Sequence, residues 1–295
     1  RVLFRSASQV VAIGADASSF DTAQLGALTT ANLSGLSLSA IAAMSADQVG
    51  ALGADASALS TAALAALTAT NAVGLSSAAV ADMTSLQISA IGSDGSMLST
   101  AALAALNTRN IVGLSSTAIA ALSSDQVQAL GADASVLGTS ALGALTSVNI
   151  RGLATAALAL MSSDQVAALG VDGAHIGTAN LAALTSLNIT GLNTSAAAAF
   201  TTAQVSAIGA DAASLATAAL AALTTFNVIG LATDHVTCPG QGLRRLRRCV
   251  EDVDGVADRR ERVAQLVGQH GQEFVLAPVG LLELVGDDLV AGLGL

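Results

Sequence analysis

The side chains with the greatest potential for chemistry recur along this sequence at one fixed spacing. An acidic residue returns with a 39-residue period, at Asp16, Asp55, Asp94, Asp133, Asp172 and Asp211. Such a row could hold cations, but Ca²⁺ takes about six to eight oxygen ligands. One Asp per copy, a whole turn of the structure apart, supplies too few. We therefore interpret each Asp as a helix cap that follows a Gly corner, and we predict no metal site.

Two carboxamide residues keep the same spacing as the acidic row. The Gln residues are Gln9, Gln48, Gln87, Gln126, Gln165 and Gln204, and the Asn residues are Asn32, Asn71, Asn110, Asn149, Asn188 and Asn227. Each Gln lies three residues after a Ser or Thr, which is the capping-box pattern of a helix start. We therefore expect Ser123→Ala to destabilise the protein and Gln126→Ala to do so less. Each Asn is interpreted as satisfying a corner, with bonding along a stack or a binding face as alternatives.

The remaining candidates for catalysis or metal binding do not form a constellation. His175 has no Cys or Asp at ligand spacing, so we interpret it as surface variation. Cys238 and Cys249 are separated by a spacing that is not typical of zinc sites, with His235 and His270 as the nearby imidazoles. A catalytic site needs one special arrangement, whereas these polar residues repeat in every copy. The sequence therefore predicts no catalytic residue, no cofactor and no enzyme activity.

The charge of the repeats excludes some classes of partner. The whole chain has no Lys, and between residues 6 and 231 the only basic residues besides His175 are Arg109 and Arg151. The same stretch carries eleven Asp. A polyanion is repelled by such a surface, which argues against nucleic acid as a partner. No run of 18 apolar residues occurs, so we predict no membrane insertion.

The pattern within each copy predicts a solenoid of short helices. The copy at residues 45–83 reads SADQVGAL, GADASAL, STAALAAL, TATNAVGL and SSAAVADM. An eight-residue step turns a helix about 80° beyond two full turns, so one continuous helix would not keep its apolar stripe buried. We expect short helices with tight corners, the longest over residues 53–67. The alternative is an α/β solenoid of the leucine-rich-repeat type, with short strands at residues 110–114 and 188–192.

The repeat register covers residues 6–233 and is lost beyond them. Every Glu, both Pro and both Cys lie after this point, and we interpret residues 234–295 as an unrelated, frameshifted or chimeric tail. A natural cap or second domain is the alternative. The first six residues, RVLFRS, match the translation of a common sequencing adapter, so residues 1–5 are predicted to be a non-native leader. On this interpretation the solenoid is a fragment of a longer protein.

Units such as SSDQVQAL, TTAQVSAI and SSDQVAAL resemble repetitive segments of very large secreted or surface proteins of Gram-negative bacteria, including adhesin-like ones. The resemblance covers residues 6–233 and implies an extended, extracellular role in adhesion or spacing, with an unknown protein or surface ligand as partner. One alternative is a scaffold that binds proteins or peptides, as many solenoids do. Another is a flat Thr/Asn face that binds ice or a polysaccharide surface.

Overall fold

The computed structural model describes residues 6–224 and 226–231. The predictions made for residues 1–5 and 234–295, a leader and an unrelated tail, lie outside the described residues and stay predictions. The chain divides into two compact units, Arg1–Ala157 and Leu158–Leu295, and each is described by itself.

Every element in the described residues is a short helix. In the first unit the α-helices are α1 Ala7–Val11, α2 Thr22–Leu25, α3 Thr30–Leu33, α4 Leu38–Ala43, α5 Ala46–Ala51, α6 Thr61–Ala65, α7 Ser77–Asp82, α8 Ser85–Ile91, α9 Thr100–Leu103, α10 Ser116–Ala121, α11 Ser124–Ala129 and α12 Thr139–Leu142. The 3₁₀ helices between them are η1 Gly14–Ser19, η2 Gly53–Ala58, η3 Ala72–Gly74, η4 Gly92–Met97, η5 Ile111–Gly113, η6 Gly131–Val136 and η7 Ile150–Gly152. Helix α13, Thr155–Leu160, contains the division between the units.

The second unit continues the same alternation. Its α-helices are α14 Ser163–Ala168, α15 Thr178–Leu181, α16 Thr194–Ala199, α17 Thr202–Ile208 and α18 Thr217–Ala221. Its 3₁₀ helices are η8 Gly170–His175, η9 Ile189–Gly191, η10 Gly209–Ser214 and η11 Val228–Gly230. The predicted all-α repeat solenoid is therefore confirmed for the described part of the chain.

The capping box begins the Gln-bearing helices, as the sequence predicts. At the start of α11, Ser123 has extended backbone, and its Oγ accepts a hydrogen bond from the Gln126 amide at 3.2 Å. Gln126 Oε1 accepts in return from the Ser123 amide at 2.8 Å. Two of the first-turn amides of the helix, which have no partner within it, are satisfied in this way.

A glycine corner ends these helices. Helix α8 stops at Gly92, whose φ is +64°, a conformation that favours glycine because it has no Cβ. The chain then tightens into the 3₁₀ helix η4 instead of continuing as an α-helix. All six described glycines with positive φ occupy this same corner, one in each copy.

The predicted long helix over residues 53–67 is wrong. Residues 53–58 form the 3₁₀ helix η2, and Leu59 and Ser60 are both extended before α6 begins. Ser60 ends the run because its Oγ accepts from the Ala63 amide at 3.1 Å and so starts a new helix. A local cap therefore competes successfully with the helix propensity of the Ala-rich stretch.

The α/β alternative is also wrong. Residues 111–113 and 189–191 form the 3₁₀ helices η5 and η9, and the described residues contain no strand. The Asn that precedes η5, Asn110, has right-handed backbone with φ −116° and ψ −21°. The β-branched residues of these segments therefore line a tight turn rather than a sheet.

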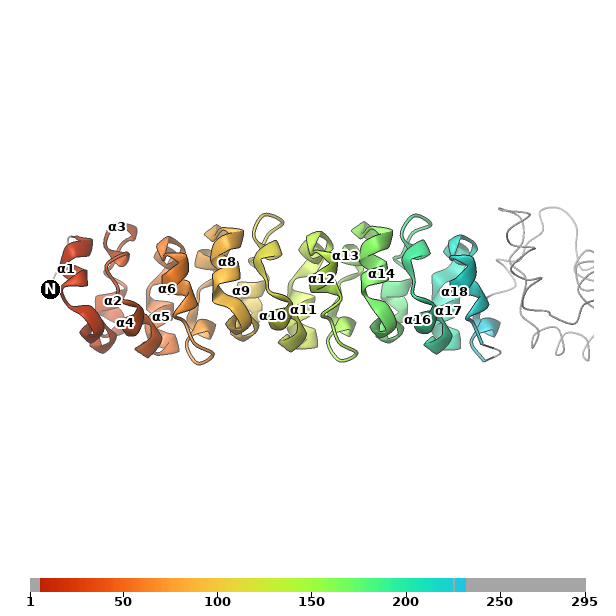
Figure 1. Ribbon diagram of the computed structural model, residues 1–295, viewed down its shortest axis with the longest axis horizontal. Coiled ribbons are helices and arrows are strands. Elements are labelled where there is room, and N and C mark those ends of the chain that lie inside the picture. The colour runs from red at the N-terminus through yellow and green to blue at the C-terminus, as the bar shows by residue number, and fades with distance from the viewer. Residues whose placement is uncertain (1–5, 225, 232–295) are drawn as a thin grey trace, which may run out of the picture. The chain divides into compact units, whose positions relative to one another are not determined.

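One turn of the first unit holds fewer residues than one copy of the repeat. Helix α8 packs against α6 and against η5, which lie about one turn before and after it. The hydrogen bonds that join successive turns link residues 23 to 30 positions apart. A turn therefore contains about 25 residues, and a 39-residue copy makes about one and a half turns. In Figure 1 the connections that follow α6 and α12 accordingly lie at one edge of this unit, and the connection after α9 lies at the opposite edge.

The core lies inside the coil and consists of small aliphatic side chains. Leu103, Ala118, Ile119 and Val127 are all buried in the first unit. Because a buried side chain such as Ala contributes little area, successive turns must approach closely to exclude water. The polar contacts between turns therefore have to be satisfied within a small space.

Candidate functional site

The recurring Gln joins each of its helices to the preceding turn. Gln126 Nε2 donates to the carbonyl oxygens of Ser96 at 2.7 Å and of Leu98 at 3.0 Å. Gln48 and Gln87 make the same pair of bonds, as does Gln204 in the second unit. We call this arrangement the Gln clamp: one side chain accepts from its own cap and donates twice across the turn.

The acceptors of the Gln clamp are backbone carbonyl oxygens at the end of a 3₁₀ helix, where the helix itself provides no donor for them. Ser96 lies near the end of η4, and Leu98 is the extended residue that follows it. Carbonyl oxygens at the end of a helix have no partner within that helix. Because a buried acceptor without a donor costs about 1–3 kcal/mol, the two bonds from Gln126 stabilise this junction.

The recurring Asn makes an equivalent junction at the next corner. Asn110 is 1% exposed, and its Oδ1 accepts from the Asn107 amide at 2.8 Å. Its Nδ2 donates to the carbonyls of Val80 at 2.8 Å and Met83 at 3.0 Å in the preceding turn. We call this the Asn clamp. Further examples in the first unit and in the second are Asn71, Asn149, Asn188 and Asn227.

The Asn clamp resolves the alternatives that the sequence left open. The corner role is confirmed, because Oδ1 accepts a backbone amide of the same corner. Bonding along the stack is confirmed as well. A ligand-binding Asn face is wrong for Asn71, Asn110, Asn149, Asn188 and Asn227, because these side chains are buried with both ends of the carboxamide engaged.

A glycine three residues after each Asn allows the turns to come this close. A Cβ on Gly113 would collide with the carbonyl oxygen of Ser85 and lie 2.9 Å from the Cβ of Ile88. Gly74 and Gly152 face the carbonyls of Ala46 and Ser124 in the same way. Glycine is required at this position because the backbone of α8 occupies the space that a side chain would need.

The Asp row does not perform the capping role that the sequence predicts. Asp55, Asp94 and Asp133 lie in the first turn of η2, η4 and η6, whereas the N-cap positions hold Leu52, Ile91 and Leu130 without a side-chain cap bond. Gly92, which begins η4, donates its amide to the carbonyl of Ser89 in the preceding α-helix, so this amide needs no cap.

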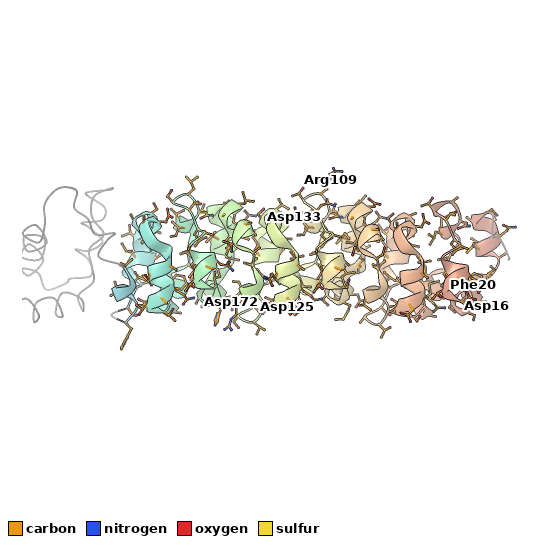
Figure 2. The ribbon with its side chains drawn as sticks, turned by 180° about the vertical axis from the view of Figure 1, so that it is seen from behind. Asp16, Phe20, Arg109, Asp125, Asp133 and Asp172 are labelled. Atoms are coloured by element: carbon orange, nitrogen blue, oxygen red, sulfur yellow. The ribbon has the colours of Figure 1, made fainter. Side chains whose placement is uncertain are left out.

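Successive Asp residues are also not a whole turn apart. Figure 2 shows Asp16 near the lower edge of the first unit and Asp133 near the upper edge, because an odd number of copies separates them. No group of three or more His, Cys, Asp or Glu side chains that could hold a metal ion occurs among the described residues.

Of the other candidate positions, the structure describes only His175. His175 is exposed at the end of η8 in the second unit. Cys238, Cys249, His235 and His270 lie outside the described residues. No helix in the part of the chain that the structure describes is long and apolar enough to cross a membrane.

The donated bonds of the Gln clamp were not predicted, although the sequence carries a signal for them. A capping box accepts Glu as readily as Gln, because both have an oxygen that can take the cap amide. All six copies nevertheless carry Gln. Glu has no N–H to donate, so its absence from this position indicates that a donor is needed there.

Comparison with known families supports the repeat. Three segments of the chain, residues 18–54, 96–133 and 135–171, match the family described as the ALTTAQ repeat. Each match has nearly the length of one 39-residue copy, which shows that this stretch is a tandem repeat segment. No curated protein and no solved structure matches the chain.

Because of the clamp, we expect Gln126→Ala to destabilise the protein more than Ser123→Ala, which is the reverse of the order expected from the sequence. Ser123→Ala removes one cap bond and should cost about 1 kcal/mol. Gln126→Ala removes the bond from the Ser123 amide and leaves the carbonyls of Ser96 and Leu98 without their donor, so it should cost about 2–3 kcal/mol. Urea unfolding followed by circular dichroism measures the loss of stability in both variants.

The exposed Gln128 on the same helix provides the control, and Gln128→Ala should be neutral. Equal losses for Gln126 and Gln128 would contradict the clamp.

Proposed function

We propose that the repeats are a structural segment of a larger secreted or cell-surface protein, with a spacing or adhesive role and no catalytic activity. The observation that carries the proposal is the use of the recurring Gln and Asn side chains. In the clamps described above they are bonded to backbone of the same corner and of the preceding turn, so they build the stack rather than present chemistry to a ligand.

The charge of the repeats supports an extracellular setting of this kind. The described residues carry eleven Asp against Arg109 and Arg151, so the surface repels polyanions and resists non-specific association. The resemblance to repetitive segments of large Gram-negative surface proteins points in the same direction.

Labelling of intact cells tests the proposal. Antibodies raised against the repeats should bind intact cells of the source organism, or its culture medium, as strongly as they bind permeabilised cells. Antibodies against a cytoplasmic protein give the control, since they should label permeabilised cells alone. Labelling of the repeats only after permeabilisation would contradict a secreted or surface location.

A protein-binding scaffold is the second candidate. The exposed position before each Asn varies between copies, with Thr70, Arg109 and Val148 in the first unit. Varied exposed residues at a repeated position favour selective binding of a protein, as in other solenoids. A flat ice- or polysaccharide-binding face has less support, because it needs an exposed row of identical side chains and the identical Asn residues are buried.

A further inference from the structure

We propose that the parity of the number of repeat copies sets the side of the stack from which any following segment leaves. The inference deepens the proposed spacing role and rests on it. One copy advances the chain by about one and a half turns, so an odd number of copies ends on the opposite side and an even number returns to the starting side.

The contacts within the first unit support this advance of about one and a half turns per copy, which we call the half-turn. Each 3₁₀ helix of the GADAS type packs against the α-helix about 24 residues later, as in η2 with α7 and η4 with α10. The Gln and Asn clamps span 27 to 30 residues. These two kinds of contact show that a turn is much shorter than a copy, so equivalent residues of consecutive copies cannot lie one above the other.

The exposed residues show the consequence. The corner that holds Arg109 lies at the upper edge of the first unit in Figure 2, and the equivalent connections one copy before and one copy after it lie at the other edge in Figure 1. The connections at residues 66–71 and 143–149 therefore share one edge, and the corner of Arg109 belongs to the other. The surface repeats every two copies, although the sequence repeats every copy. Gain or loss of a single copy moves a following segment to the other side of the stack. A change of two copies alters only the length of the stack before that segment.

Distances between spin labels on the full chain test the half-turn. Asp47, Leu86 and Asp125 are exposed and occupy the same position of three consecutive copies. With Cys238 and Cys249 changed to Ser, one variant carries Asp47→Cys with Leu86→Cys, and a second carries Asp47→Cys with Asp125→Cys. Thr70→Cys paired with Arg109→Cys or with Val148→Cys gives an independent set at the corners.

The half-turn predicts nearly equal distances for the two pairs of each set. The pair one copy apart is separated across the coil as well as along it, whereas the pair two copies apart is separated along it alone. With about 10 Å between packed turns, the longer pair should exceed the shorter by less than about 1.4-fold. A whole turn per copy would make the ratio about two, and this result would overturn the proposal while leaving the cell-labelling test of the spacing role unaffected. Unchanged circular dichroism shows that each labelled chain is folded.

Discussion

Replacing Gly113 by alanine should lower the free energy of unfolding by about 3 kcal/mol, at the upper end of the usual cost of overpacking. The new Cβ would meet the carbonyl oxygen of Ser85 and lie 2.9 Å from the Cβ of Ile88. The first of these contacts is with backbone, which cannot rotate away as a side chain can. The turn that holds η5 must therefore move away from α8, and the neighbouring Asn clamp would lengthen with it.

Gly138→Ala is the matched control. A Cβ on Gly138 would meet nothing within 4 Å, and its φ of −67° suits any residue. The last copy already carries Ala216 at the equivalent position. Chemical denaturation should therefore show a large loss for Gly113→Ala and a change below about 1 kcal/mol for Gly138→Ala. Similar midpoints for both variants would show that successive turns are not packed this closely.

Asn110→Asp should destabilise the protein by more than about 3 kcal/mol, because it places a carboxylate where a buried donor is needed. The ionised side chain can accept from the Asn107 amide, but it cannot donate to Val80 or Met83, whose carbonyl oxygens it would then repel. The added charge is buried, since Asn110 is almost fully enclosed.

Asn107→Asp applies the same chemical change three residues earlier, at a half-buried position of the same corner. Asn107 accepts from the Arg109 amide through Oδ1 at 3.0 Å, which an Asp can also do, and loses only one donated bond to Ala81. Thermal unfolding should show a loss below about 1 kcal/mol for this variant. If Asn110→Asp is as mild as Asn107→Asp, the Asn row is not a junction between turns.

The local parts of the structure could be predicted from the sequence. Ser123 and Gln126 lie three residues apart, and a capping box depends only on that spacing and on extended backbone at the cap. The glycine corner at Gly92 is local in the same sense, because positive φ is a property of one residue. Six copies in register then identify a solenoid of short helices without any knowledge of how its turns stack.

The junctions between turns could not be predicted because they depend on the rotation at each corner. The period of the repeat fixes which positions are equivalent, but Gln126 bonds to residues 28 and 30 positions earlier. That distance follows from about 25 residues per turn, which is set by the extended residues at each break, such as Leu59 and Ser60. The expectation of one Asp per turn was wrong for the same reason, because the sequence does not reveal the rotation of the chain at each corner.

Hydrogen exchange of the side-chain carboxamides, measured by NMR on the intact protein, tests the central claim that the recurring polar residues hold the turns together. The Nδ2 protons of Asn71, Asn110 and Asn149 should exchange at least about 100-fold more slowly than those of Asn107, because their release requires the turns to separate. Equal exchange rates for the buried Asn row and for Asn107 would show that these side chains are accessible to solvent and would contradict the account.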